Sequence, residues 1–211
     1  MREGPTWKTA KYPWENECMI PQTTTSVHRS EFTLGILAGG SGRRAGRRDK
    51  GLLVTEGRTL IEIMLTEGRD EFAETIACCR ENHWFYSLFI DRVFSDSRSD
   101  EGPLWGITNL LGATETEFLA VLPCDQKSLP GEWLNCLAGA MGADDMGIFA
   151  SDGGRHTPCC LLRRQAGSRL EEALKQGHRS LQVLFNDPGF KLMDMPSMGD
   201  DVDTISKLQS E

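Results

Sequence analysis

Apolar positions along the chain fall into short continuous runs, separated by segments in which they recur every three or four residues. A continuous run of about four to eight residues is typical of a strand buried on both faces. The clearest run, Glu117 to Leu122, has the sequence EFLAVL, and Phe32 to Leu37 forms another near the start of the chain. Further strands are predicted at residues 72–79, 92–94, 147–151, 157–163 and 190–193.

The intervening segments have the period of helices. In residues 102–111, Pro103 suits the first helical turn, and apolar residues follow at helical spacing. Because strands alternate with helices, we predict one three-layer, Rossmann-like α/β domain with a mainly parallel, mixed sheet over residues 32–211. Residues 1–31 have no clear period, so we expect a poorly ordered or surface-draped N-terminal extension. Other helices are predicted at 59–67, 83–89, 130–141, 167–175 and 180–185, and from residue 204.

The composition narrows the class of protein. At 211 residues the chain is long enough for one α/β domain with a sizeable core. Its formal net charge of −8 argues against nucleic-acid binding. The seven cysteines are odd in number and have no C-x-x-C spacing, so we expect reduced thiols rather than a zinc or disulfide framework. No apolar stretch approaches the roughly 18 residues of a membrane span, and we expect a cytoplasmic protein without a membrane partner.

A glycine-rich turn follows the first predicted strand directly. Glycines occupy positions 39, 40 and 42, and five basic residues follow within eight positions. Glycines let backbone N–H groups approach an anion closely because no Cβ blocks them, and guanidinium and ammonium groups pair with phosphate oxygens. We therefore interpret residues 39–50 as a polyphosphate cradle. Its basic residues are Arg43, Arg44, Arg47, Arg48 and Lys50.

Two common phosphate-binding loops fit this stretch poorly. A Walker A loop requires a glycine directly before its lysine, and Lys50 has none there. The dinucleotide fingerprint G-x-G-x-x-A matches residues 40–45, and Glu62 lies at a suitable distance for a ribose contact. That fingerprint opens a long helix, however, and Gly46 and Gly51 interrupt one here, which favours an extended loop.

Acidic residues follow two other predicted strands. Asp96 comes after the strand at 92–94, and Asp125 follows EFLAVL. In parallel sheets, ligands bind outside the carboxyl ends of the strands, so these residues are expected to converge with the glycine-rich turn. Mg²⁺ prefers one or two carboxylates together with phosphate oxygens and water. Asp125 is therefore the best candidate for a Mg²⁺ ligand.

The stretch LAGGSGRRAGRRDKGLL resembles the LAGGxGxRxGxxDKGLL signature of nucleotidyltransferases, most of all in the version found in MobA-like molybdenum cofactor guanylyltransferases. The resemblance extends over about residues 33–208, in the family's order and spacing. Its further segments are VFSDSRSDEGPLWGI, FLAVLPCD, DGGRHTPCCLL and GHRSLQVLF.

This resemblance implies a reaction. GMP would be transferred from GTP to the phosphate of molybdopterin, or of molybdenum-loaded molybdopterin, with Mg²⁺ as cofactor. Pyrophosphate would be released and molybdopterin guanine dinucleotide formed. The resemblance also implies that another cofactor-biosynthesis protein could deliver the molybdopterin to this one.

The resemblance also implies roles for the glycine-rich stretch. Leu37, Ala38 and Gly39 would hold the guanine nucleotide, with Gly40 in the same turn. Lys50 would bind the phosphates of the nucleotide.

Four further roles follow for charged residues. Asp96 matches an aspartate that contacts the nucleotide, and Asp125 matches the Mg²⁺ ligand of the PCD motif. Asp203 is a candidate second metal ligand. Arg44 is a candidate clamp for the charge that develops during transfer. The basic residues expected on the molybdopterin side are Arg155, His156, His178 and Arg179.

Three segments depart from the family pattern. Residues 77–80, Ala-Cys-Cys-Arg, lack the asparagine with which the family binds nucleotide. Gln126 and Lys127 replace the Thr-Pro pair that usually follows PCD, and an N-x-N-T pattern appears as residues 201–204, Asp-Val-Asp-Thr. These departures leave open a related nucleotidyltransferase that uses CTP or a sugar 1-phosphate, and a GTP-binding module without turnover. The glycine fingerprint separately leaves open an oxidoreductase.

Overall fold

The computed structural model describes residues 29–38, 49–55, 57–66, 72–95, 102–126 and 133–195. Within these residues, seven strands form one sheet: β1 (Phe32–Ala38), β4 (Glu74–Cys79), β5 (Arg92–Ser95), β6 (Phe118–Pro123), β7 (Gly147–Asp152), β8 (Arg155–Arg163) and β9 (Phe190–Asp194).

The order of the strands is β5-β4-β1-β6-β8-β7-β9. Strand β1 pairs in parallel with β4 and β6, and β4 pairs in parallel with β5. Strand β8 runs antiparallel to both β6 and β7, whereas β9 is parallel to β7. The predicted mainly parallel, mixed sheet is therefore confirmed. A separate two-stranded ladder joins β2 (Val54–Thr55) to β3 (Arg58–Thr59).

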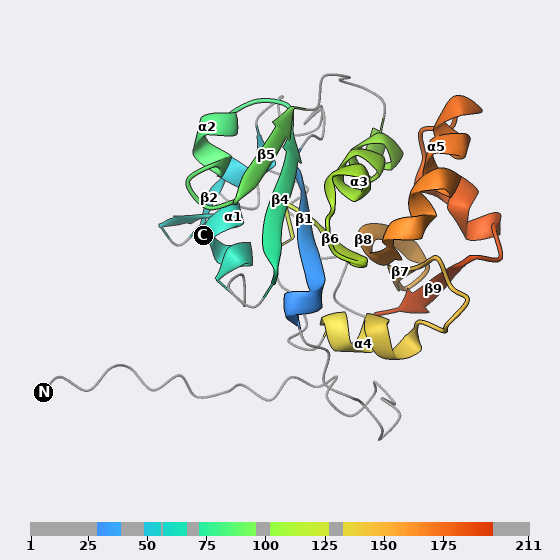
Figure 1. Cartoon of the computed structure of the whole chain (residues 1–211). Coiled ribbons are helices and arrows are strands. Elements are labelled where there is room, and N and C mark those ends of the chain that lie inside the picture. The colour runs from blue at the N-terminus through green and yellow to red at the C-terminus, as the bar shows by residue number, and fades with distance from the viewer. Residues whose placement is uncertain are drawn as a thin grey trace, which may run out of the picture.

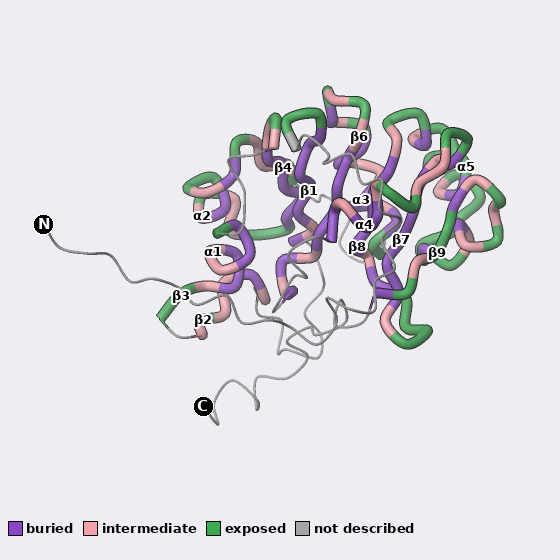
Figure 2. The backbone as a smooth tube through the Cα atoms, turned by 90° about the horizontal axis from the view of Figure 1, so that it is seen from below, coloured by how far each residue is buried: buried purple, intermediate pink, exposed green. Residues whose placement is uncertain are grey.

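Helices cover both faces of the sheet (Figure 1). The helices α1 (Leu60–Leu65), α2 (His83–Tyr86) and α4 (Trp133–Ala140) pack on one face. On the other face lie α3 (Gly102–Ala113), α5 (Gly167–Lys175) and the 3-10 helix η7 (Leu181–Asn186). Figure 2 shows the resulting pattern, in which buried residues follow the central strands and exposed residues gather on the surrounding turns. This is the predicted three-layer arrangement.

Successive residues of each central strand contribute to opposite cores. In β4, Cys78 faces the layer of α3 and α5, whereas Cys79 faces the layer of α1 and α2. Cys159 and Cys160 divide in the same way in β8. The alternation of adjacent cysteines predicts one core residue in each pair. Both members of each pair are buried, because both faces of the sheet are covered.

Local sequence signals explain several element ends. Thr59 caps α1 with its side chain, and Glu62 returns a hydrogen bond to the Thr59 backbone N–H, which completes a capping box. The turn between β7 and β8 places Gly153 and Gly154 at φ values of 54° and 83°. Such positive φ angles suit glycine, and a two-residue turn of this kind matches the twist of a hairpin.

The predicted elements differ from the observed ones mainly at their ends. The helix expected over 59–67 ends at Leu65, and the one expected over 83–89 ends at Tyr86. The segment 180–185 forms a 3-10 helix. Residues 1–28 of the expected extension and the helix expected from residue 204 lie outside the described residues.

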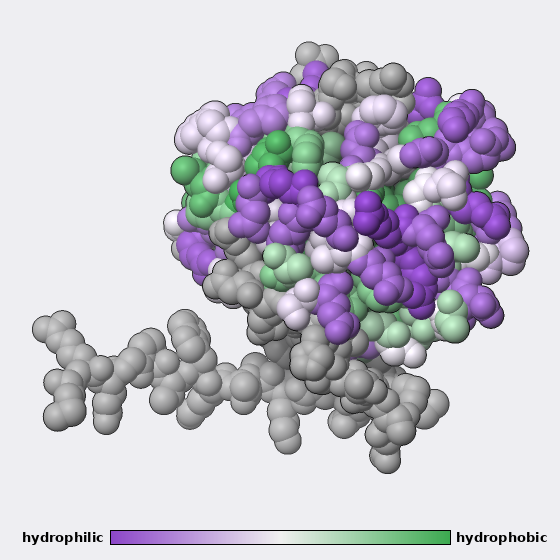
Figure 3. Space-filling view, in the orientation of Figure 1, coloured by the Kyte–Doolittle hydropathy of each residue, from purple (hydrophilic) through white to green (hydrophobic). Residues whose placement is uncertain are grey.

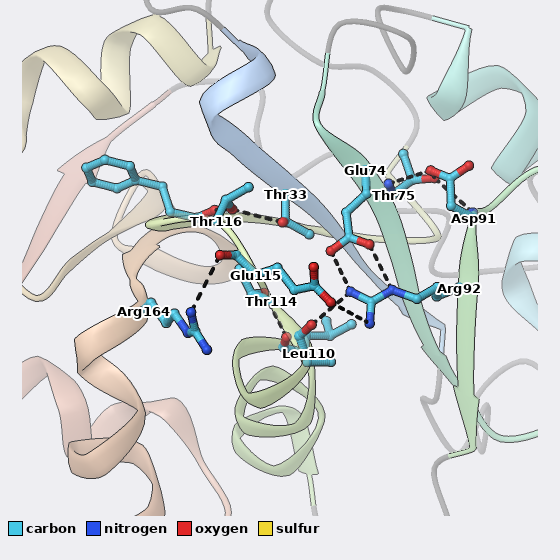
Figure 4. Close-up of polar contacts among 12 residues, drawn as sticks. Thr33, Glu74, Thr75, Asp91, Arg92, Leu110, Thr114, Glu115, Thr116 and Arg164 are labelled. Atoms are coloured by element: carbon cyan, nitrogen blue, oxygen red, sulfur yellow. Dashed lines mark hydrogen bonds and ion pairs between the residues drawn. The ribbon is translucent and has the colours of Figure 1, made fainter.

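A polar network ties the strands together at the edge where they begin (Figure 4). The Arg92 guanidinium donates to both carboxylate oxygens of Glu74, at 2.8 and 2.5 Å, and to the Ala113 carbonyl at the end of α3, at 2.9 Å. The hydrogen bonds to Glu74 raise the pKa of Arg92. Asp91 accepts from the Thr75 backbone N–H and hydroxyl, both at 2.7 Å. These contacts set the start of β5 against β4.

Within the part of the chain that the structure describes, no helix combines the length and the apolar character needed to cross a bilayer.

We expect Arg92→Met to lower the free energy of unfolding by about 1 kcal/mol, because a bidentate pair and a helix-end contact are lost. This figure allows for solvent screening, since the Arg92 side chain is 37% exposed. Urea denaturation would measure the change. Glu115→Gln is the matched control, because Glu115 lies 3.9 Å from Arg92 and is 82% exposed. Equal losses in both variants would contradict the structural role given to the Glu74 pair.

A second prediction concerns the thiols of the core. Burial raises the pKa of Cys159 to about 12 and raises that of Cys160 well above its usual value. At pH 8 each thiol therefore stays protonated, with a thiolate fraction of about one in ten thousand for Cys159. Iodoacetamide should leave both residues unmodified in the folded protein and alkylate them after denaturation, as mass spectrometry of the peptides would show. Rapid alkylation of the folded protein would contradict their burial.

Candidate functional site

The strands β1 and β6 end side by side at the carboxyl edge of the sheet. Leu37 is paired with Pro123, and the Cys124 backbone N–H donates to the Leu37 carbonyl at 3.0 Å. This hydrogen bond extends the ladder one residue beyond β6. As a result, the residue after it, Asp125, is held at the edge towards which β1 also runs.

Lys50 and Asp125 meet at this edge. The Lys50 ammonium lies 2.7 Å from the Asp125 carboxylate, although the two residues are 75 positions apart in the sequence. Their side chains are 22% and 15% exposed, so the pair is mostly buried but still accessible. An accessible ammonium and carboxylate in contact are suited to binding an anion and a cation together.

The loop that carries Lys50 is anchored by the residue before it. Asp49 caps the 3-10 helix η4 (Lys50–Leu52) by accepting the Gly51 backbone N–H at 3.1 Å. The same carboxylate accepts the Tyr86 hydroxyl at 2.6 Å and the Asn82 side-chain amide at 3.1 Å. Both partners come from α2 and the residue that precedes it. The loop is therefore bound to a separate part of the fold.

Glycine is required at position 51. A Cβ there would collide with the hydroxyl of Tyr86 and lie 3.3 Å from the Cβ of Cys124. The small residue lets η4 lie directly on these two side chains, which belong to the core.

Leu37 and Ala38, predicted to bind the nucleotide, lie at the end of β1. Leu37 is partly buried, and a Cβ on Gly106 of α3 would come within 2.8 Å of its side chain. Ala38 is buried in the core below. A ligand at this edge would therefore meet the backbone of these residues more readily than their side chains.

Cysteine and glutamine side chains lie behind Asp125. The Cys159 thiol donates to the Gln126 side-chain carbonyl at 3.7 Å, and Gln126 is buried. Burial raises the pKa of Cys124, and the neighbouring Asp125 and Asp49 carboxylates act in the same direction. Cys124 is thus a neutral residue that packs in the core at the end of the strand. The departure from the family pattern at Gln126 places an amide in the core beside Asp125.

The donor set fits a metal that takes most of its ligands from substrate and water. Among the described residues, no group of three or more histidine, cysteine, aspartate or glutamate side chains could hold a metal ion. Asp125 offers one accessible carboxylate, which suits Mg²⁺ bound mainly by phosphate oxygens and water. Asp203, the other predicted ligand, lies outside the described residues.

The basic residues expected on the acceptor side lie on segments that pack against one another. The His156 ring is 4.4 Å from the Phe185 ring of η7. Just before η7, the Arg179 carbonyl accepts the Leu104 backbone N–H at 3.4 Å and closely faces Gly102 at the start of α3. The four basic side chains are exposed. Figure 3 shows hydrophilic surface around α5, the helix that ends shortly before His178 and Arg179. These side chains are Arg155, His156, His178 and Arg179.

Several predicted site residues cannot be placed. They lie outside the described residues and keep only their sequence-based roles; they are Gly39, Gly40, Arg44, Asp96 and Asp203.

Three residues of the site were not predicted from the sequence: Asp49, Asn82 and Tyr86. The signals available for them were weak. Asp49 precedes the lysine of the cradle, and Tyr86 is one of only two tyrosines in the chain. Nothing local connects either with Asn82.

The contacts of Glu62 bear on the dinucleotide-binding alternative. The dinucleotide fingerprint would use its carboxylate for a ribose. In the structure, Glu62 accepts the Thr59 backbone N–H at 2.8 Å and the Thr59 hydroxyl at 2.6 Å. These hydrogen bonds lower its pKa and account for the residue as part of a helix cap.

Known proteins share this fold and sequence pattern. The family model of the MobA-like NTP transferase domain matches residues 34–188. A molybdenum cofactor guanylyltransferase of Shewanella amazonensis is 35% identical over 154 residues, which are 71% of this chain and 78% of the relative. One from Shewanella sp. strain MR-4 is 31% identical over 180 residues, or 82% of this chain and 91% of the relative.

A solved structure has a similar fold. The molybdopterin-guanine dinucleotide biosynthesis protein A of Archaeoglobus fulgidus superposes with a TM-score of 0.68 at 21% identity, covering 84% of this chain and 95% of its own. With the family match over residues 34–188, these similarities show that the chain belongs to the MobA-like NTP transferase family and is a nucleotidyltransferase.

Proposed function

We propose that this enzyme transfers GMP from GTP to the phosphate of molybdopterin, with Mg²⁺ as cofactor, and thereby forms molybdopterin guanine dinucleotide. The observation that carries the proposal is the contact between Lys50 and Asp125 at the carboxyl edge of β1 and β6, 2.7 Å apart. It joins a phosphate-binding cation to a candidate metal ligand beside the glycine-rich stretch. The names of the relatives support GTP and molybdopterin as the substrates.

The reaction needs no nucleophile from the protein. An oxygen of the acceptor phosphate attacks the α-phosphorus of GTP, a new phosphorus–oxygen bond forms, and the bond to the β-phosphate bridge breaks to release pyrophosphate. Catalysis then depends on alignment of the two phosphates and on neutralisation of their charge.

Lys50 and Asp125 have different electrostatic roles in this proposal: Lys50 binds the phosphates, and Asp125 binds the metal ion. In the free enzyme each neutralises the other. When the triphosphate binds, the Lys50 ammonium would turn to its oxygens, and Asp125 would become available to hold Mg²⁺. Bound Mg²⁺ would supply positive charge to the phosphate oxygens. Arg44 would add a planar donor for the charge of the departing pyrophosphate.

The acceptor side is formed by the basic segments around η7. Arg179 is fixed through its backbone to the start of α3, and His156 is fixed by its contact with Phe185. Exposed basic side chains on a fixed backbone suit the phosphate of molybdopterin.

The first test measures pyrophosphate release with Mg²⁺ and each of GTP, CTP, ATP and UTP, with and without molybdopterin on a carrier protein. Release with GTP alone, dependent on molybdopterin, is the expected result. Release with CTP instead would overturn the choice of base. Tight binding of GTP without release in the presence of any acceptor would favour a nucleotide-binding module, one of the alternatives that the sequence left open.

Lys50→Gln and Asp125→Asn should each lower the rate of pyrophosphate release by about 100-fold or more, because each removes charge that stabilises the transition state. Melting temperatures would show that the variants are folded. Arg169→Gln is a matched surface control, since Arg169 on α5 pairs with Asp187 at 2.9 Å, away from the carboxyl edge. Unchanged rates in folded Lys50 and Asp125 variants would contradict the proposed site.

Arg179→Gln should act on the acceptor rather than on the nucleotide. We expect its KM for molybdopterin to rise about tenfold, because one charge-assisted contact to phosphate is lost, while the Kd for GTP stays unchanged. Steady-state kinetics and a separate GTP titration would distinguish the two effects. A weaker GTP affinity with an unchanged KM for molybdopterin would assign Arg179 to the nucleotide side instead.

A further inference from the structure

We propose that Asn82 and Tyr86 are positioning residues that act through Asp49 to aim Lys50 at the phosphates of the nucleotide. This inference rests on the proposed function in one respect, which is that Lys50 binds the triphosphate. It adds two residues that lie outside the glycine-rich stretch. Among the hydrogen bonds and ion pairs of the described residues, neither one contacts Asp125 or a basic side chain of the acceptor side.

The Asp49 carboxylate is held from three directions. One of its oxygens accepts the Tyr86 hydroxyl at 2.6 Å and the Gly51 backbone N–H at 3.1 Å, and the other accepts the Asn82 amide at 3.1 Å. Asn82 and Tyr86 are 33 and 37 positions away in the sequence. The contacts thus connect the Lys50 loop to α2, and they use both oxygens of the carboxylate.

Asn82 has a conformation that few other residues adopt. Its φ of 58° and ψ of 29° are left-handed, and among the described residues it is the only non-glycine residue with a positive φ. Asparagine tolerates this region better than most residues do. The left-handed turn places the Asn82 side chain at the N-terminal end of α2, where its amide reaches Asp49 rather than capping its own helix.

Tyr86 supports the same carboxylate from within the core. It is 0% exposed, yet its hydroxyl reaches Asp49. Burial, together with the nearby Cys124 and the Asp49 carboxylate, raises the pKa of Tyr86 far above its usual value, so the hydroxyl stays protonated and donates to Asp49 at neutral pH. A buried ring cannot move aside, which makes it a rigid support for the carboxylate.

Lys50 receives its position from this support. It follows Asp49 directly, and its carbonyl accepts the Leu53 backbone N–H at 3.1 Å, while the Asp49 carbonyl accepts that of Leu52 at 3.2 Å. The backbone on either side of Lys50 is therefore fixed, and the ammonium moves only by rotation of its own side chain. Such placement matters because small displacements of a charged group weaken its contact with the ligand.

The test is a double-mutant cycle read out by GTP binding. Tyr86→Phe keeps the buried ring and removes only the hydroxyl. Asn82→Gly keeps the left-handed backbone and removes only the amide. Each is made in the wild-type protein and in the Lys50→Gln variant. NMR titration would measure the Kd, because it extends to the millimolar range.

We expect each substitution to weaken GTP binding about five- to tenfold in the wild-type protein and less than twofold in Lys50→Gln, since the residues act through Lys50. Inorganic pyrophosphate, used as a second probe, should show the same pattern. Ser87→Ala is the control from the same segment, because the Ser87 hydroxyl contacts only the Trp84 carbonyl, at 2.8 Å, among the hydrogen bonds described, and it should leave the Kd unchanged.

Three other results of this experiment would overturn the positioning role of Asn82 and Tyr86. Equal losses in both backgrounds would show a general structural role and overturn the positioning role, as would unchanged GTP binding in the two single variants. If the wild-type protein itself bound no nucleoside triphosphate, the proposed function would fall, and this assignment with it. A drop in melting temperature shared by both backgrounds does not alter the comparison, because the cycle compares losses within each background.

Discussion

The whole arrangement depends on the burial of three adjacent parallel strands, β4, β1 and β6, on both of their faces. Apolar layers above and below leave no room for charge within the sheet, so polar chemistry is confined to its two edges. Parallel strands also all end at the same edge. Residues that follow different strands are thereby brought together, and Asp125 is placed within reach of Lys50.

The two edges have different tasks. At the edge where the strands begin, Arg92 pairs with Glu74 and with the end of α3, and Asp91 accepts hydrogen bonds from Thr75, which favours stability. At the opposite edge, the charges of Lys50 and Asp125 are close together and partly accessible. A buried ion pair contributes little to stability unless its geometry is excellent. Its retention here is consistent with a binding role, in which ligand charges replace the partner.

The structure shows what two of the segments that depart from the family pattern do, the one at residues 77–80 and the one at Gln126. Cys79, within the segment that lacks the family's asparagine, is buried in β4 and contributes to the core. An asparagine is nevertheless present three residues later, at Asn82, and its amide contacts the loop of Lys50 through Asp49. Gln126 is likewise buried and accepts a hydrogen bond from Cys159. In both places the chain has a polar group near the site, bound to protein atoms.

The sequence by itself determined the order and type of nearly all elements, because periodicity, caps and glycine turns are local properties. It also singled out Lys50 and Asp125, since a cradle lysine and a strand-end aspartate can be recognised from their neighbours. Only the tertiary structure decided that the two touch, and that both members of each pair of adjacent cysteines, 78–79 and 159–160, are buried. It also decided that Asp49 is held by Asn82 and Tyr86. These contacts join residues that are far apart along the chain, and they depend on strand order and helix packing, which no local pattern records.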